Sequence, residues 1–348
     1  MIGLNVPSQD AILLYDLDLK VARTVILGEE AQTLWGFSPD GCRVLATLDD
    51  RLVTADLMGK QVREVLNGGV YEPSWSPSGN QIVFTWTQGE GEDTQTFIAL
   101  INAEGGTATR LSATGNEATP RWSPDGTQVA YVSYEQRVAG ADLFATAIPT
   151  SPPLDGQVIE PPTLVNEADL WVANVATGER TRLTHFPTGN VSMPRWSPDG
   201  TLLSFVYSPA GNQDLLWIIA NQADAIPTQL SFDYTTVLDT TWLPEGTHLI
   251  ASLMGMQGVG ENRVWMIPLG ERAETAAVPY MDSFNLISAD YPRFSGDGRV
   301  LANRTAYALS LIDLSTATQT LLSDEWALGN TPPVWMPEGY EGENRCTR

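Results

Sequence analysis

The sequence predicts an all-β protein, a seven-bladed β-propeller of four-stranded antiparallel blades in a single domain over residues 1–348. Two observations carry this prediction. The phrase PRWSPDG occurs at 120–126 and again at 194–200, and looser forms occur five more times. The aromatic residues of the seven phrases are 38, 47, 74, 46, 52 and 41 residues apart, and periods of about 40–50 residues are typical of propeller blades. These aromatic positions are Phe37, Trp75, Trp122, Trp196, Trp242, Phe294 and Trp335.

The first half of each repeat is a strand that ends in the aromatic residue, a tight turn, and a second strand. In S-P-D-G, Pro sets φ at the first corner of a type I turn, Asp tolerates the second, and Gly accepts the left-handed conformation that follows. An apolar run comes next, as in RVLATL at 43–48 and QVAYVS at 128–133. Such runs are typical of strands.

The second half of each repeat is an apolar strand that ends near Asp or Asn, then a turn and a polar strand, as in LVTADLMGKQVREVL at 52–66. Side chains of Asp and Asn at this place commonly form Asx turns, so we expect them to be structural rather than catalytic. The aligned positions hold Asp16, Asp56, Asn102, Asn174, Asn221, Pro268 and Asp313.

The two ends of the chain complete one another in this scheme. The chain begins at the third strand of a repeat and ends just after a first strand, so the N-terminal strands are expected to pair with the C-terminal strand and close the ring. The second strand of that closing blade would have to come from YEGENRCTR at 340–348, which is poor strand material. The sequence therefore leaves an incomplete closing blade, or a truncated chain, as open alternatives.

The repeats resemble those of the WD-repeat-like propeller family of TolB, in which W-S-P-D-G is followed by an apolar strand. PRWSPDGTQVAYVS at 120–133 and ERTRLTHFPTGNVSMPRWSPDGTLLSFVY at 179–207 carry the resemblance, which covers about residues 11–340. It implies a propeller, and it implies less about function. Related repeats occur in periplasmic binding components, in oligopeptidase propellers and in some polysaccharide lyases. TolB also has an N-terminal α/β domain for which this chain has no room, which argues against a direct Tol–Pal role.

Charge and hydropathy limit the partners that the sequence predicts. Lys and Arg number 19 against 42 Asp and Glu, for a formal charge of −23. Such a protein should repel nucleic acids and anionic membrane surfaces, and it could attract a basic partner or a cation. No run of 18 apolar residues occurs, so no membrane insertion is expected. The N-terminus has no signal pattern, which leaves a cytoplasmic protein or one whose signal was removed; the resemblance favours an extracytoplasmic location.

Two cysteines, Cys42 and Cys346, are too few for a disulfide scaffold or a Cys-rich zinc site. Cys42 begins the second strand of the first complete repeat, and Cys346 follows the last repeat. A bridge between them would join the ends of the ring in an oxidising compartment. The alternative is that Cys42 is a small, partly buried strand residue.

The sequence offers little for catalysis, and no catalytic residue or cofactor is predicted. It contains neither G-x-S-x-G nor G-x-x-x-x-G-K-[ST]. The two histidines, His185 and His248, are too few for the multi-His metal site of propeller lyases and are expected to be structural. Forty-two acidic residues leave carboxylate catalysis open. One acidic tip, with Glu90, Glu92 and Asp93, offers oxygen ligands for Ca²⁺, although a solvated hairpin tip is the favoured interpretation.

Three arginines occupy one position of the repeat. The phrases PRW and PRF place Arg121, Arg195 and Arg293 at the same point of the innermost strand. Three guanidinium groups near the central channel could hold a carboxylate of a ligand or peptide. The favoured alternative is that each arginine pairs with a carboxylate of a neighbouring blade.

The longest insertions fall on one side of the predicted disc. They are the loops at 87–95 and 255–263 and the segment at 137–168, which accounts for the spacing of 74 and has the pattern of an extra hairpin with a Pro-rich tip. Long loops on a rigid scaffold are where binding concentrates. The sequence therefore favours a monomeric, non-enzymatic platform for a protein or peptide partner. The alternatives are a carbohydrate-active or other hydrolytic propeller with a carboxylate-lined pocket, and a sensor or lid module.

Overall fold

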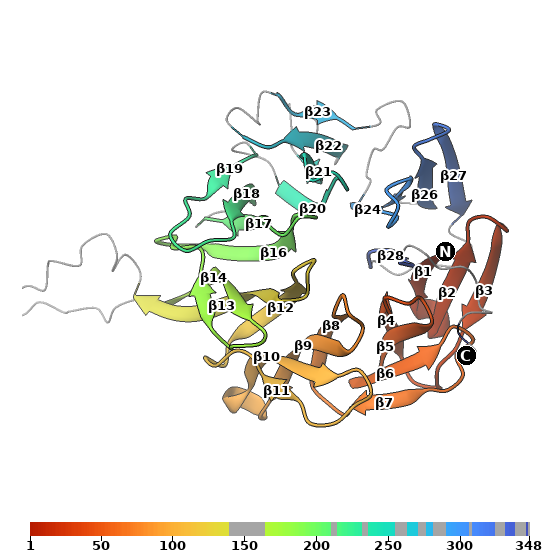
Figure 1. Cartoon of the computed structure of the whole chain (residues 1–348), viewed down its shortest axis with the longest axis horizontal. Coiled ribbons are helices and arrows are strands. Elements are labelled where there is room, and N and C mark those ends of the chain that lie inside the picture. Colours follow the sequence, from red (N-terminus) through yellow and green to blue (C-terminus); the bar gives the residue numbers. More distant parts are fainter. Residues whose placement is uncertain are drawn as a thin grey trace, which may run out of the picture.

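A computed structural model of the chain arranges β-sheets around a central axis (Figure 1). The structure describes residues 1–138, 164–209, 214–231, 236–254, 263–270, 276–280, 290–305, 308–323, 331–337 and 346. Within them, neighbouring strands of each repeat pair antiparallel, as the sequence predicts. No helix in this described part of the chain has the length and apolar character needed to cross a bilayer.

Five sheets have four strands each, and in each of them the strands follow one another from the axis outwards. The first comprises β28 (Val334–Trp335), β1 (Ile2–Val6), β2 (Ala11–Asp16) and β3 (Val21–Val25). The second comprises β4 (Gln32–Phe37), β5 (Arg43–Leu48), β6 (Arg51–Asp56) and β7 (Arg63–Leu66). The third comprises β8 (Val70–Trp75), β9 (Gln81–Gln88), β10 (Gln95–Asn102) and β11 (Thr109–Arg110).

The other two four-stranded sheets lie near the C-terminal end of the chain. One comprises β20 (Thr236–Trp242), β21 (His248–Met254), β22 (Arg263–Pro268) and β23 (Val278–Pro279). The other comprises β24 (Asp290–Phe294), β25 (Val300–Arg304), β26 (Ala308–Asp313) and β27 (Thr318–Ser323). Two short 3-10 turns, η1 (Pro7–Gln9) and η2 (Gly91–Asp93), complete the elements outside the largest sheet.

The prediction of seven separate blades is wrong, because the described residues form five separate four-stranded blades and one eight-stranded sheet. That sheet contains β12 (Glu117–Trp122), β13 (Gln128–Val138), β14 (Leu164–Asn174), β15 (Arg180–Arg182), β16 (Asn190–Trp196), β17 (Leu202–Ser208), β18 (Leu215–Ala220) and β19 (Thr228–Gln229). It holds the Trp122 and Trp196 repeats, which a parallel pairing of Ala168 with Asn190 joins. The join forms where β14, lengthened to 11 residues, runs past the end of its own blade.

The two ends of the chain lie in one sheet. Strand β1 pairs antiparallel with β28 through Ile2–Trp335 and Gly3–Val334. The N-terminal residues therefore supply the second strand of this blade, and the expectation that this strand comes from 340–348 is wrong. The sequence analysis missed it because IGLNV is short and precedes the first recognisable turn of the repeat.

The S-P-D-G turns are locked by their own side chains. In the turn after β12, the Ser123 hydroxyl donates to Asp125 at 2.6 Å and accepts the amide of Gln128 at 2.9 Å, while Asp125 accepts the amide of Thr127 at 3.0 Å. The same pattern of contacts recurs around Asp40, Asp199 and Asp297. These donors lower the pKa of Asp125, with the Ser123 hydroxyl as the largest cause.

The turns also contact one another between repeats, which the sequence analysis did not foresee. The glycine that ends a turn has positive φ and lies against the proline of the preceding turn, so a Cβ on Gly126 would lie 3.3 Å from Pro77 Cδ. The pairs follow one another along the chain and are Pro39–Gly79, Pro77–Gly126, Pro124–Gly200, Pro198–Gly246 and Pro244–Gly298. The repeated phrase thus specifies a contact between neighbouring repeats as well as a turn.

The turns between the third and fourth strands are Asx turns at several of the predicted positions. The Asp16 carboxylate accepts the amides of Asp18 and Leu19, each at 2.9 Å. Similar contacts are made by Asp56, Asn102, Asn174 and Asp313. Asn221 differs, because its amide donates to Gln128 in the neighbouring repeat.

The hydrophobic core lies between successive sheets rather than in one central mass. One cluster joins β2, β4 and β5 through Ile12, Leu34 and Val44, and another joins β21 to β25 and β26 through Ile250 and Leu301. The apolar second and third strands of each repeat therefore pack against both neighbouring sheets. This packing leaves the innermost strands to line the axis.

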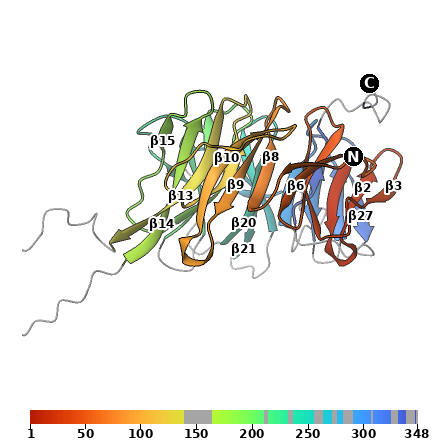
Figure 2. The ribbon, with the colours of Figure 1, turned by 90° about the horizontal axis from the view of Figure 1, so that it is seen from below.

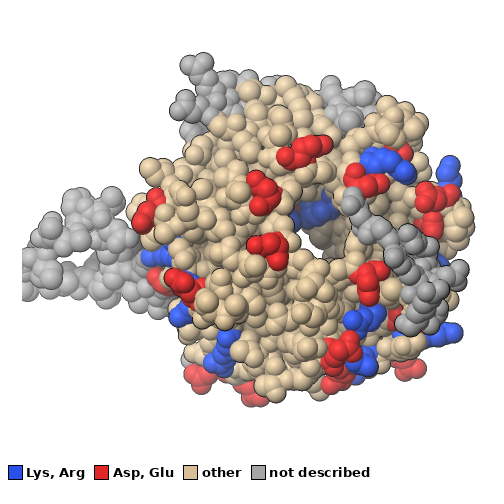
Figure 3. All heavy atoms as spheres, in the orientation of Figure 1, with Lys and Arg blue, Asp and Glu red and all other residues tan. Residues whose placement is uncertain are grey.

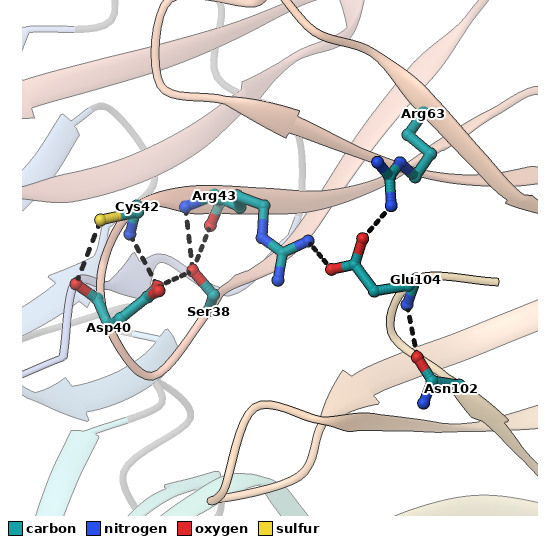
Figure 4. A network of polar contacts seen from close by, with 7 residues as sticks. All are labelled: Ser38, Asp40, Cys42, Arg43, Arg63, Asn102 and Glu104. Carbon is teal, nitrogen blue, oxygen red and sulfur yellow. Dashed lines mark hydrogen bonds and ion pairs between the residues drawn. The ribbon is translucent and has the colours of Figure 1, made fainter. Parts of the chain in front are cut away.

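A disulfide connects Cys42, just before β5, with Cys346, and their Cα atoms are 5.3 Å apart. Figure 4 shows Cys42 beside the turn that Ser38 and Asp40 lock, next to an ion-pair network between repeats. There Arg43 pairs with Glu104 at 2.7 Å, and Arg63 pairs with the other oxygen of the same carboxylate. Of the alternatives that the sequence left open for Cys42, the bridge is the one present.

Candidate functional site: a channel arginine cluster

Each of the three predicted arginines lies next to a bulge in an innermost strand. The pairing registers shift between Ala118 and Arg121, between Ser192 and Arg195, and between Asp290 and Arg293. The proline before each arginine has no N–H to give to the ladder, and strands accommodate proline at bulges. The residues before these prolines adopt positive φ; they are Thr119 (56°), Met193 (52°) and Tyr291 (52°). The Pro-Arg dipeptide thus favours the bulge and also supplies the arginine side chain that the bulge reorients.

The tryptophan of the next repeat holds each arginine's backbone. The indole N–H of Trp196 donates to the carbonyl of Arg121 at 2.9 Å, and that of Trp242 donates to the carbonyl of Arg195 at 3.3 Å. Trp335 donates to the carbonyl of Arg293 at 3.0 Å. Each indole therefore donates to the neighbouring repeat, and it fixes the main chain from which the arginine extends.

Two of the arginines share one buried carboxylate. Arg195 Nη2 lies 2.7 Å from Asp239 Oδ1, and Arg293 Nη2 lies 2.7 Å from Asp239 Oδ2. Asp239, on β20 between the two arginine strands, is 4% exposed. Burial acts to raise the pKa of Asp239, but Arg195 and Arg293 outweigh it and hold that pKa below its usual value. For these two arginines, the predicted pairing with a neighbouring blade's carboxylate is present.

Arg121 is bound differently. Its Nη1 donates to the carbonyl of Pro120 at 2.8 Å and lies 3.8 Å from Glu72 Oε2, on the innermost strand of the preceding sheet. That oxygen has no hydrogen-bond partner among the described residues. A separation of 3.8 Å is an ion pair without a hydrogen bond. Of the three arginines, Arg121 is thus the one whose nearest carboxylate oxygen lies beyond hydrogen-bond distance.

The arginines lie deep in the molecule but remain in contact with solvent. Burial is the largest cause that lowers the pKa of Arg121 and of Arg293, the latter to about 10. Yet the side chains of Arg121, Arg195 and Arg293 are 32, 25 and 17% exposed. A position on an inner, solvent-accessible surface accounts for both properties, and Figure 3 shows basic atoms on the wall of a central opening.

Comparisons with known proteins place this geometry on a known fold. No family model matches the chain. A putative TolB from Agrobacterium tumefaciens is 17% identical, with 89% of this chain and 87% of that one covered and a TM-score of 0.50. TolB from Acinetobacter baumannii is 15% identical over 97% of this chain and 66% of that one, with a TM-score of 0.51. The fold is that of a TolB-like β-propeller.

Peptidase-related proteins also resemble this TolB-like propeller. A structure from work on two prolyl endopeptidases has a TM-score of 0.60 at 11% identity, over 90% of this chain and 46% of that one. A Bacillus subtilis protein described as the uncharacterized peptidase YuxL is 24% identical over 173 residues, which are 49% of this chain. The chain thus spans about a quarter of the length of this curated relative, for which the covered share is 24%.

The arginine cluster of the TolB-like propeller is suited to binding rather than to proton transfer. Three guanidinium groups face two carboxylates, Asp239 and Glu72, so the cluster holds more positive than negative charge. Asp239 stays ionised because its pKa is lowered, so it is no reservoir for a proton at neutral pH. Arginines with unused donors are the usual partners of carboxylates.

The other predicted candidates lie away from these arginines. His185 is exposed, and His248 contacts the neighbouring Thr247 hydroxyl at 3.0 Å. Glu90 and Asp93 are exposed at the η2 turn, and the side chain of Glu92 lies outside the described residues. In the part of the chain that the structure describes, no three His, Cys, Asp or Glu side chains are grouped to hold a metal ion. Of the predicted loops, 139–163 and 255–262 also lie outside the described residues.

Two members of the site were missed by the sequence analysis. Asp239 stands in VLDTTW and Glu72 in VYEPSW, just before the aromatic position of each repeat. A usable signal was available, because Asp239 is a charged residue inside a strand that is otherwise apolar or Thr-rich. Its partners could not be named from the sequence, because they come from the repeats on either side.

Proposed function

We propose that this TolB-like propeller is a non-enzymatic scaffold that binds a protein or peptide partner through the loop side of its disc. The observation that carries the proposal is an arm formed by β13 and β14. Both strands have 11 residues, whereas β17 and β18 of the next repeat have 7 and 6. Their ladder continues without a register shift from Gln128–Asn174 to Val138–Leu164.

The arm and a shorter loop extend to the same side of the disc. In Figure 2 the free ends of β13 and β14 project outward at the lower edge of the disc, and the turn between β9 and β10 lies at the same lower edge, while the tight turns lie above. The tight turns are bound by their own hydrogen bonds and by the Pro–Gly contacts. A rigid disc that presents its variable elements on one side is a common arrangement for binding.

The partner that fits the charge is basic. The protein carries a formal charge of −23, which accelerates association with a positive surface and opposes association with a negative one. We propose a monomer that meets such a partner through the arm and the 87–95 loop. The proposal also includes a closed ring, in which the β1–β28 pairing and the Cys42–Cys346 bridge join the ends.

The test uses the intact protein and a variant in which residues 135–167, which include the outer part of β13 and β14, are replaced by a short Gly-Ser link. Each is immobilised and exposed to a lysate of the source cells at low and at high salt, and retained proteins are identified. We expect a basic protein that only the intact form retains, with retention falling as salt rises. Equal retention by both forms, or none by either, would contradict the arm as the binding element.

A second candidate follows from the peptidase-related relatives. The match to YuxL and the prolyl endopeptidase neighbour favour the alternative of a hydrolytic propeller. Incubation of the pure protein with a fluorogenic peptide mixture separates the two candidates. Hydrolysis that persists through two independent purifications would favour the hydrolase, and its absence together with partner capture would favour the scaffold.

A further inference from the structure

We propose that Arg121 is the ligand-binding member of the channel arginine cluster, and that it takes the carboxylate of a peptide-like ligand which also carries positive charge. This inference concerns the channel and not the arm, so it is independent of the proposed partner of the loop side. It replaces the three equivalent arginines of the sequence analysis with an asymmetric site.

The asymmetry comes from how the carboxylates are distributed. Arg195 and Arg293 are held by the two oxygens of Asp239 at 2.7 Å each, on a residue that is 4% exposed. Arg121 has no such partner, because Glu72 stands 3.8 Å away and makes no hydrogen bond with that oxygen. Five innermost strands, β8, β12, β16, β20 and β24, therefore supply two arginines that share one carboxylate at 2.7 Å, beside a third arginine whose nearest carboxylate oxygen is 3.8 Å away.

The guanidinium of Arg121 is held in place for a ligand. Trp196 fixes the Arg121 carbonyl at 2.9 Å, and the guanidinium turns back to the Pro120 carbonyl at 2.8 Å. An arginine has five N–H donors, and the described contacts of Arg121 use one of its nitrogens. At 32% exposure the group is reachable from the channel. Planar guanidinium groups bind carboxylates in a two-pronged geometry, and that geometry needs a free edge.

Glu72 acts as the internal competitor for this position. It lies on the neighbouring innermost strand with positive φ of 48° just before Pro73, the backbone conformation that Thr119 has before Pro120. A carboxylate at a distance of 3.8 Å offsets part of the charge of Arg121 without occupying its donors. A ligand carboxylate that makes true hydrogen bonds would therefore add contacts instead of merely exchanging them.

The charge of the whole molecule selects among carboxylates. A net charge of −23 repels free anions, and Figure 3 shows acidic side chains around the opening with basic atoms inside it. A ligand with a cationic group followed by a carboxylate would complement both the acidic rim of the opening and the arginine inside it. The C-terminal carboxylate of a short basic peptide has this chemistry, and a small dicarboxylate does not.

The experiment measures binding by calorimetry at fixed ionic strength with three probes: Lys-Lys-Ala-Ala with a free C-terminus, the same peptide as its C-terminal amide, and succinate. We expect the free acid to bind, and the amide and succinate to bind at least about tenfold more weakly, a factor equal to about 1.4 kcal/mol. Equal binding of acid and amide would overturn the carboxylate contact. Tighter binding of succinate would overturn the requirement for positive charge.

Paired variants separate binding from folding. Arg121→Gln should weaken binding of the free-acid peptide by about tenfold or more. Glu72→Gln should strengthen its binding several-fold, because the competing carboxylate is removed. Both variants remove the same ion pair, so a purely structural role would move both affinities in the same direction. Arg63→Gln, at a surface pair with Glu104, is the control and should change nothing. An unchanged affinity in Arg121→Gln, or a weakened one in Glu72→Gln, would overturn the proposal.

Discussion

At the scale of single residues, the buried charge of the channel is the most sensitive feature. Asp239 is the counter-charge of two arginines that are themselves largely enclosed. Its removal leaves two guanidinium groups facing one another, and Arg195 already contributes, after burial, to lowering the pKa of Arg293. The stability of the folded protein therefore depends on the negative charge of Asp239.

We expect Asp239→Asn to lower the free energy of unfolding by about 3 kcal/mol, because breaking one side of a buried pair strands the other. Urea unfolding of the pure protein measures this loss. Glu30→Gln is the control, since Glu30 pairs with Arg51 at the surface, and such pairs contribute about 0–1 kcal/mol. Equal effects of the two variants would show that Asp239 is not a structural counter-charge.

Because of the aspartates in the turns, we expect the stability of the fold to depend on pH in the acid range. Hydrogen bonds from Ser123 and Thr127 lower the pKa of Asp125 below its usual value. A folded-state pKa below the unfolded one means that the stabilisation is present above about pH 4 and is lost as pH falls through the folded value. Urea midpoints should therefore be flat from about pH 7 to pH 5 and fall below about pH 4. Asp125→Asn should make that fall shallower, and an unchanged slope would contradict the assignment.

At the scale of elements, the turn phrase of one repeat is also a contact surface for the next. Gly298 has φ of 66°, and a Cβ there would lie 2.8 Å from Pro244 Cγ. Gly178 has nearly the same φ, 71°, with nothing within 4 Å of its Cβ position. Both glycines therefore need positive φ, but only Gly298 also lies against a residue of the neighbouring repeat.

This pair gives a matched measurement of the contact between repeats. Gly178→Ala should cost about 1 kcal/mol, the cost of placing a side chain at positive φ. Gly298→Ala should cost at least about 1 kcal/mol more, because the added methyl meets Pro244. Thermal or urea unfolding of both variants tests the difference. Indistinguishable losses would mean that the Pro–Gly contact accommodates a methyl without strain.

The sequence predicted what a repeat encodes locally, and it missed what depends on neighbours. The residues of a single repeat are enough to predict the turn, the Asx positions and the placement of Arg121, Arg195 and Arg293 on innermost strands. The pairing of Asp239 with two arginines, the Pro–Gly contacts and the β14–β16 join lie between repeats. Such contacts need the order and spacing of the sheets, which no single phrase contains.

At the scale of the whole molecule, β1 pairs with β28, and a disulfide connects Cys42 with Cys346. The bridged residues are 304 apart in the sequence, so the bridge removes a large loop-closure entropy from the unfolded chain. Disulfides of this kind persist in oxidising compartments.

We expect reduction to lower the free energy of unfolding by up to about 5 kcal/mol. Unfolding of the native protein with and without dithiothreitol measures this loss, and Cys42→Ser should show the reduced stability in both conditions. A native protein whose unfolding is insensitive to the reductant would show that the bridge contributes nothing to stability.

The pairing of the first strand with the last has a consequence for synthesis. Strand β1 is complete by residue 6, and its inner neighbour β28 begins at residue 334. At about 5–20 residues per second, a ribosome needs roughly 20–60 s to make that partner. Throughout this time β1 presents an unpaired, apolar edge beside the strands that follow it. The nascent chain thus passes through a prolonged stage that is open to edge-to-edge association until β28 is made.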